Sequence, residues 1–426
     1  MKQQICLHGL DVKRPNQLLT LLTKNLPPSA VKSRLKEKYL NDNDILKYTD
    51  NKITLNHKAG YKVRCLSGVM VVSDKLSPIN DVVITYDSGS VEDVRRIVKK
   101  LLASKIKFVV EEPDLELRIR QQRGYYRLTD SPLYNSDDIM TALACHLPWQ
   151  VYGVNKSWAE LLARPDDKPS VRQLRVKLRR LRSSLTFFKP LLPVSSADYW
   201  RQVLKGWTNL LSDAREYDVA LMTCAKIRRS QPEGEASLPL SLEKLLVEER
   251  QLASEKMRSI KGLNKLTETL AELLLFLQST PVTEAYCSMR LKSFLRLRLN
   301  AWCDNLAALP GKYPDMHNME QLHRIRIKVK RFRYALQGVP EIATPPTLLR
   351  SLKSLQDMLG LLHDDYINDR LVENILQRNE ENAALRYEGA MFCGWERAKA
   401  EAALAVLPDL WVGFMEQLGE WRSECL

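Results

Sequence analysis

Two segments of the chain carry cationic side chains at a spacing that suits the binding of a polyanion. They are VRQLRVKLRRLRSSLTFF at 171–188 and LHRIRIKVKRFRYALQGV at 322–339. In each segment four cations follow one another in steps of three, four and three residues, which places them along one stripe of an α-helix. The first row consists of Arg172, Arg175, Arg179 and Arg182, and the second of His323, Arg326, Lys330 and Arg333. One guanidinium group can bind two phosphate oxygens at once, and an ammonium group acts as a point charge. The two rows therefore predict a phosphate-rich ligand.

Both segments also have the apolar stripe of an amphipathic helix. It consists of Leu174, Leu178, Leu181, Leu185 and Phe188 in the first copy, and of Leu322, Ile325, Val329, Phe332 and Leu336 in the second. No acidic residue interrupts 168–189 or 321–340, although like charges on neighbouring turns destabilise a helix by about 0.2–0.5 kcal/mol per pair. A solvated basic face is the alternative for either helix alone, but the matched pair favours a functional row.

The repeat continues downstream with a second pair of segments. WRQVLKGWTNLLSDAREYDVAL at 200–221 aligns with LLRSLKSLQDMLGLLHDDYINDRL at 348–371. This alignment adds Lys205, Arg215, Lys353 and His363 to the predicted phosphate-binding residues. Four acids follow the aligned cations, namely Glu216, Asp218, Asp364 and Asp365. Such carboxylates can ligate a metal or act in catalysis, but we expect them to pair with the arginines and orient them.

These motifs resemble the CHAD family, the conserved histidine α-helical domains. The family pattern H-x-x-R-x-x-x-[RK]-R-x-R matches His323, Arg326, Lys330, Arg331 and Arg333 here, and the likeness extends over about 135–426. It includes RLKSFLRLRLNAW at 290–302. The resemblance implies two four-helix bundles related by pseudo-twofold symmetry, binding of inorganic polyphosphate in a central basic cavity, and association with polyphosphate granules.

The first copy departs from the family pattern at two positions. Arg172 stands where the family has its histidine, so we expect anion binding to be kept and any pH sensitivity that rests on two histidines to be reduced. Ser212 stands where the second copy has Gly360, which we expect to alter a helix turn or its packing.

The pattern of apolar residues predicts a smaller α+β domain at 1–134 and an all-α domain at 135–426, with halves at about 135–278 and 282–426. In the first domain we expect helices at 14–26, 28–40 and 90–105 and strands at 52–58, 61–66, 68–73, 81–87 and 107–112. A strand pair is predicted at 115–129, turning near Gly124. Beyond residue 135, proline-containing segments separate long helical patterns.

Composition excludes several other classes of protein. The 426 residues carry a net charge of +14, and the eight cysteines form no C-x-x-C pair, so neither a zinc site nor a disulfide framework is predicted. No apolar run approaches the roughly 18–20 residues of a membrane span, and the N-terminus lacks a signal-peptide core. We therefore expect a cytoplasmic protein with no membrane partner, no cofactor, no metal and no catalytic residue. P-loop, G-x-S-x-G, H-E-x-x-H and Rossmann motifs do not occur in a suitable context.

Three other functions stay open at this stage. The same basic surface could bind single-stranded nucleic acid, although stacking aromatics are sparse along it. The first domain could be a degenerate triphosphatase of the CYTH family, because the basic segment 115–129 resembles a strand pair of that family, but the chain lacks an E-x-E-x-K opening. Finally, the first domain could dock a protein partner, which the sequence does not identify.

Overall fold

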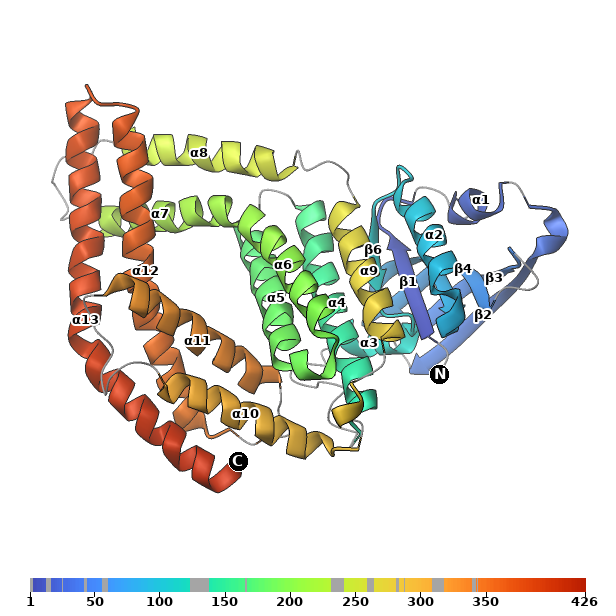
Figure 1. Cartoon of the computed structure of the whole chain (residues 1–426). Coiled ribbons are helices and arrows are strands. Elements are labelled where there is room, and N and C mark those ends of the chain that lie inside the picture. Colours follow the sequence, from blue (N-terminus) through green and yellow to red (C-terminus); the bar gives the residue numbers. More distant parts are fainter. Residues whose placement is uncertain are drawn as a thin grey trace. The chain divides into compact units, whose positions relative to one another are not determined.

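The computed structural model describes the chain in thirteen stretches. They are residues 3–12, 17–24, 26–41, 44–55, 60–122, 138–164, 167–230, 241–258, 264–280, 283–286, 288–308, 318–338 and 344–426, together with residue 342. The chain packs into two compact units (Figure 1). Unit 1 comprises Met1–Leu181, Phe188–Gln202 and Ile260–Ser288, and unit 2 comprises Arg182–Phe187, Val203–Ser259 and Met289–Leu426.

Unit 1 is built on a six-stranded antiparallel sheet with the strand order β2-β3-β4-β5-β1-β6. Its strands are β1 Gln3–Gly9, β2 Val31–Asn41, β3 Asp44–Ile53, β4 Tyr61–Val72, β5 Lys75–Tyr86 and β6 Phe108–Glu111. Its helices are α1 Gln17–Thr23, α2 Val91–Leu102, α3 Leu115–Gln122, α4 Ile139–Ala163 and α9 Lys265–Ser279. The α+β character predicted for the first part of the chain is therefore confirmed, and so are the helices at 14–26 and 90–105.

Each face of the sheet buries a separate apolar cluster. On one face, Ile5 and Val82 pack with Val98 of α2 and Leu274 of α9. On the other face, the smaller cluster contains Leu46, Leu66 and Met70 together with two residues of α3, Leu115 and Ile119. Alternate residues of a strand point to opposite faces, so one β-strand such as β4 contributes to both clusters.

A close approach of two strands requires glycine at one position of the sheet. Gly68 in β4 lies opposite Tyr48 in β3. A Cβ atom at Gly68 would lie 2.1 Å from the carbonyl oxygen of Lys47, far inside van der Waals contact. Any side chain at this position would push β3 and β4 apart.

Several sequence-based predictions in unit 1 are wrong. The predicted helix at 28–40 is strand β2 over its length from Val31, preceded by a short 3-10 turn at Pro28–Ala30. The lysines and the glutamate of this segment favour a helix. Its cations, however, stand at every second position, which is the period of a strand, and pairing with β3 decides the conformation. The strands predicted at 61–66 and 68–73 are one strand, β4.

The predicted strand pair at 115–129 is helix α3 over residues 115–122, and the turn at Gly124 lies outside the described residues. The Asp114 carboxylate caps this helix by accepting hydrogen bonds from the backbone N–H groups of Glu116 (2.8 Å) and Leu117 (3.3 Å). Leu115 and Ile119 lie one turn apart and are both buried against the sheet. The strand pair on which the CYTH resemblance rested is therefore not formed over these residues.

From residue 139 onward, every element of regular secondary structure that the structure describes is a helix, as the sequence predicts. Those that lie wholly in unit 2 are α7 Ser212–Arg229, α8 Ser241–Arg258, α10 Leu291–Ala307, α11 Met319–Gly338, α12 Pro346–Gln377 and α13 Ala383–Cys425. Helices α5 Lys168–Phe187 and α6 Val194–Leu210 contribute residues to both units. The predicted domain boundary near residue 134 stays a prediction. Helices α4 and α9, which follow it in the sequence, lie in the same compact unit as the sheet.

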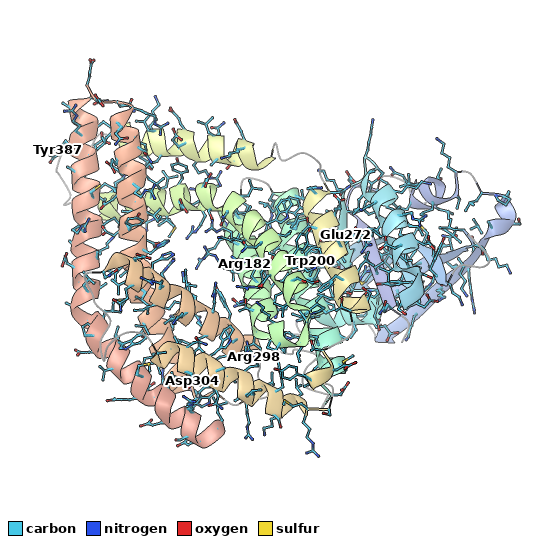
Figure 2. The ribbon with its side chains drawn as sticks, in the orientation of Figure 1. Arg182, Trp200, Glu272, Arg298, Asp304 and Tyr387 are labelled. Atoms are coloured by element: carbon cyan, nitrogen blue, oxygen red, sulfur yellow. The ribbon has the colours of Figure 1, made fainter. Side chains whose placement is uncertain are left out.

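Unit 2 has its own core, in which α12 and α13 pack along much of their length (Figure 1). Ile375 of α12 and Phe392 of α13 are buried there with Leu246 of α8. Arg298 lies on α10 (Figure 2). Its Nε donates a 2.8 Å hydrogen bond to the carbonyl oxygen of Phe187 at the end of α5. This bond satisfies one of the carbonyls that a helix C-terminus leaves without a partner.

None of the described helices combines the length and the apolar character that crossing a bilayer requires. Cys6, Cys65 and Cys303 are buried free thiols. Burial raises the pKa of Cys65 to about 12, so this thiol stays protonated and packs as a small apolar side chain.

Candidate functional site

The two repeated helices bury the apolar stripe that the sequence predicts. In α5 every residue of the stripe is buried, and the same holds for α11. The cationic rows of the two helices are more accessible than the apolar stripes. Arg172 and His323 are exposed, and Arg326, Lys330 and Arg333 are half-buried. Arg175 is the exception, because only 7% of its surface is exposed. The amphipathic geometry of both helices therefore follows from their own sequences.

The predicted site residues are divided between the two compact units. Arg172, Arg175 and Arg179 belong to unit 1. The other nine belong to unit 2, namely Arg182, Lys205, Arg215, His323, Arg326, Lys330, Arg333, Lys353 and His363. The prediction that the rows of both copies line one cavity stays a prediction.

Within unit 2 the structure brings cations from two helices around one carboxylate. Burial raises the pKa of Asp364 in α12, and the positive charges of Arg326, Lys330 and Arg215 act in the opposite direction. Arg326 and Lys330 lie on α11, and Arg215 lies near the start of α7. The negative charge of Glu396 also raises this pKa, so three cations lie near two carboxylates and leave a local excess of positive charge, which suits an anionic ligand.

The two histidines of the predicted site lie side by side. The rings of His323 in α11 and His363 in α12 have centroids 5.3 Å apart and planes inclined by 36°. Burial lowers the pKa of His323, and the charges of Arg326 and Lys330 lower it further. The His323 ring is therefore largely neutral at pH 7, and a bound anion would favour its protonated form.

A cavity of about 360 Å³ opens beside this histidine pair, between α11 and α12. Its polar lining consists of Glu320, His323, Arg326, His363 and Tyr366, and its apolar lining of Leu322, Leu359, Leu362 and Ile367. Sequence reasoning did not single out Tyr366, which is 47% exposed. A phenol ring at this position offers a flat surface next to the cations of α11.

Sequence reasoning also missed the partner of Arg333. Its Nη1 donates a hydrogen bond to Oε1 of Gln356, a buried side chain of α12. Gln356 precedes His363 by seven residues and therefore lies on the same face of α12. This spacing could have identified Gln356 as a site residue from the sequence. This hydrogen bond fixes the guanidinium of Arg333 in one orientation.

Two of the other three acids contact cations outside the predicted rows. Asp218 accepts a 3.2 Å hydrogen bond from Nε of Arg250, and Asp365 lies 3.6 Å from Nη1 of Arg397. In the described parts of the chain, no three His, Cys, Asp or Glu side chains are grouped so that they could hold a metal ion.

Lys205 and Lys353 are exposed, and neither forms an ion pair with a described residue. The two copies also differ where Ser212 replaces Gly360. In the first copy α6 ends at Leu210 and α7 begins at Ser212, whereas α12 runs unbroken through Gly360. Ser212 Oγ donates to the Thr208 carbonyl at 3.1 Å, a bond that bends helices.

Comparison with known proteins agrees with this architecture. The family model of the CHAD domain matches residues 154–373. The fold is similar to the crystal structure of the CHAD domain from the plant Ricinus communis, with a TM-score of 0.52, 21% identity, and coverage of 66% of this chain and 93% of that chain. It is also similar to PptA from Streptomyces chartreusis, with a TM-score of 0.50, 21% identity, and coverage of 65% and 100%.

The chain belongs to the CHAD domain family. This family is linked in general to polyphosphate binding. A search of curated proteins gives no match. At 21% identity the two solved structures support the fold alone.

Proposed function

We propose that this chain binds inorganic polyphosphate through the cationic rows of α5 and α11. The observation that carries the proposal is the group of Arg215, Arg326 and Lys330 near Asp364, together with the neighbouring rings of His323 and His363. Polyphosphate presents a charge at every phosphate, and a row of cations at helical spacing matches such a regular ligand. Arginine would bind two oxygens at once, and lysine would add charge without fixed geometry.

The test is the affinity of the full chain for long-chain polyphosphate over a series of salt concentrations. For a flexible polyanion the log–log slope is about −0.7 per phosphate neutralised, so roughly six contacts give a slope near −4. Weak binding with a slope near zero would refute the proposal. Whether binding localises the chain to polyphosphate granules is a further expectation, and it is tested by microscopy of cells with and without polyphosphate.

Single-stranded RNA is the second candidate ligand, and one observation favours it. Tyr366 lines the cavity beside Arg326, where a base could stack on its ring. Competition between long-chain polyphosphate and single-stranded RNA separates the two ligands. We expect polyphosphate to displace RNA, because the α11 row offers charges at close spacing and Tyr366 is the one Phe, Tyr or Trp side chain in the lining of this cavity. Tighter binding of RNA would reverse the assignment.

The pKa of His323 predicts how binding depends on pH. The free protein holds this pKa below the ordinary value, and a bound polyanion raises it, so binding is linked to proton uptake. Affinity for polyphosphate should therefore increase as the pH falls from about 8 to about 5.5. His323→Gln should flatten the profile between these values.

Other titratable groups belong to the same site: Glu320 and His363 line the cavity with His323, and Asp364 lies near Arg326 and Lys330. Protonation of Asp364 removes a negative charge and would also favour the polyanion at low pH, since burial raises its pKa. Asp364→Asn therefore serves as the matched control, which should raise affinity at every pH but keep the slope that His323 causes. A slope unchanged in His323→Gln would assign the pH dependence to Asp364, His363 or Glu320.

A further inference from the structure

The sheet of unit 1 has two edges, and the helices that the structure describes cover only one of them. At β6, the Asn264 side chain accepts from the backbone N–H of Phe108 (2.8 Å) and that of Asn155 accepts from Val110 (3.1 Å). Thr267 donates to the carbonyl oxygen of Phe108 at 2.6 Å. At the other edge, β2 is last in the strand order, and no described residue is seen to hydrogen-bond to its outer side. An eleven-residue strand with an open edge is a template for a further strand.

The register of β2 shows which backbone groups face the open edge. The N–H of Thr54 donates to the carbonyl oxygen of Ala30 at 2.9 Å, and Val31 lies opposite Ile53. Bonded and non-bonded pairs alternate along an antiparallel ladder, and the register has no shift before Tyr39. The even-numbered residues of β2 are therefore bonded to β3. The N–H and C=O groups of Ser33, Leu35 and Glu37 point to the open side.

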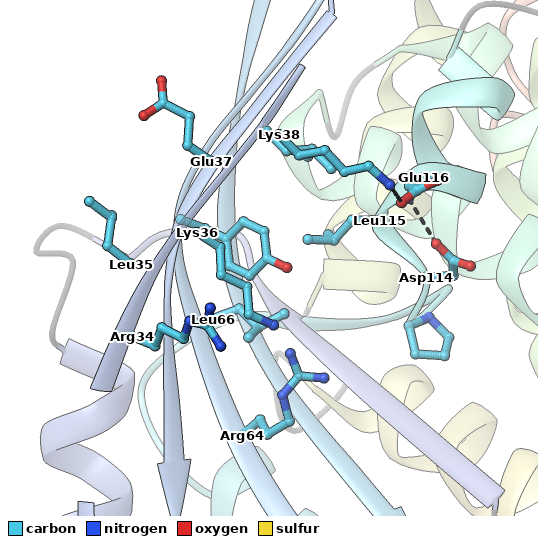
Figure 3. Close-up of a pocket in the computed structure, with 13 residues that line it drawn as sticks. Arg34, Leu35, Lys36, Glu37, Lys38, Arg64, Leu66, Asp114, Leu115 and Glu116 are labelled. Carbon is cyan, nitrogen blue, oxygen red and sulfur yellow. Dashed lines mark hydrogen bonds and ion pairs between the residues drawn. The ribbon is translucent and has the colours of Figure 1, made fainter. Parts of the chain in front are cut away.

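The side chains along β2 form a row of positive charge on one face of the sheet. The row consists of Lys32, Arg34, Lys36 and Lys38, and a groove of about 630 Å³ runs beside it, bounded by the first turn of α3 (Figure 3). Lys36 contacts the buried carboxylate of Asp50 at 2.9 Å, and Lys38 pairs with Glu116. Lys32 and Arg34 are exposed and form no ion pair with a described residue. Their charges are available to a ligand at the edge.

The opposite face of the strand carries exposed apolar side chains. Leu35 and Tyr39 are 63% and 67% exposed. A strand added to this edge would direct alternate side chains to the two faces. A segment in which acidic and apolar residues alternate would meet the cations with its carboxylates and Leu35 and Tyr39 with its apolar side chains.

A second copy of the chain fits this edge poorly. Two β2 strands paired antiparallel would bring their rows of lysine and arginine onto the same face, where like charges destabilise cross-strand pairs. The same row favours a strand of opposite charge. We propose that the open edge of β2 is a docking site for an extended acidic segment of a partner protein, which adds to the sheet as a seventh strand.

The test uses the full chain and two labelled peptides of eleven residues, the length of β2. One peptide alternates glutamate with valine, and the other has the same composition with all glutamates at one end. Fluorescence anisotropy should give clear binding of the alternating peptide and at least roughly tenfold weaker binding of the other. Hydrogen exchange should show new protection at the N–H groups of Leu35 and Glu37. Equal binding of the two peptides would overturn the proposal.

Two variants separate charge from backbone pairing. Lys32→Glu with Arg34→Glu should weaken binding of the alternating peptide by roughly tenfold. The matched control reverses two exposed lysines away from this edge, Lys100→Glu with Lys105→Glu, and should change binding less than about twofold. Leu35→Pro removes an N–H from the open side while leaving the bonds to β3, so it should abolish the exchange protection.

Three outcomes would contradict the proposed docking of an acidic segment at the edge of β2. Peptide binding unchanged by Leu35→Pro, with the sheet intact by circular dichroism, would mean that no strand is added. Self-association of the chain with β2 protected in the absence of peptide would make a second copy the occupant. Loss of peptide binding in a variant of Arg326 and Lys330 would mean that the peptide occupies the proposed polyphosphate site, so failure of one proposal leaves the other testable.

Discussion

Replacing Arg326 and Lys330 together by alanine should weaken polyphosphate binding by about 100-fold, because charge-assisted hydrogen bonds contribute about 1.5–3 kcal/mol each. Both side chains are half-buried on α11, and their charges act on Asp364 in α12. Removing two phosphate contacts should also make the log–log salt slope shallower by about 1.4. The measurement is the dissociation constant for long-chain polyphosphate at several salt concentrations.

The matched control removes two cations of unit 2 that lie outside the site, Lys292 and Arg350. Both are exposed, and neither forms an ion pair with a described residue. The double alanine variant has the same net charge as the test variant, so a loss of affinity that depends only on net charge would be equal in the two. We expect the control to bind within about threefold of the parent chain at physiological salt, where exposed charges are largely screened. Equal losses would mean that the α11 row is not a specific site.

The second large effect concerns stability rather than binding. Phe332→Ala should lower the free energy of unfolding by about 3–5 kcal/mol, because it leaves a cavity in the core of unit 2. Phe332 is 1% exposed and packs edge-to-face on Trp421 of α13, with ring centroids 6.4 Å apart. The loss is measured by denaturant unfolding followed through tryptophan fluorescence.

The comparison variant is Tyr387→Ala, which removes an aromatic ring from the same unit. Tyr387 is 65% exposed on α13 (Figure 2), and its loss should change the free energy of unfolding by less than about 0.5 kcal/mol. Below its unfolding transition the Phe332 variant should still bind polyphosphate, since the cations of α11 lie on another face of the helix. Similar stability of the two variants would show that the stripe of α11 is not the core that its burial indicates.

The two proposals together describe a chain with two anionic ligands. The cationic rows of the CHAD family region would bind polyphosphate, and the open edge of β2 would bind an acidic segment of a partner. The ligands differ in what selects them: a flexible polymer needs closely spaced cations, whereas an added strand needs free backbone groups in register. The chain would then connect a protein partner to polyphosphate.

The sequence by itself determined the helical part of this protein, because the information there is local. The apolar stripe from Leu174 to Phe188 and its repeat from Leu322 to Leu336 repeat at helical period, and both are buried. The cationic rows follow from the same spacing. The repeat also led directly to the family, since it preserves the order of several motifs.

Only the tertiary structure decided the conformation of β2 and α3. Residues 31–41 contain strong helix formers, and pairing with β3 overrides this preference. Residues 115–122 have apolar positions that fit either period, and the cap by Asp114 together with burial against the sheet favours the helix. The neighbours of the site, such as Gln356 beside Arg333 and the three cations around Asp364, depend on contacts between helices distant in sequence. Periodicity specifies which face of a helix is buried, but it does not specify which helix lies against that face.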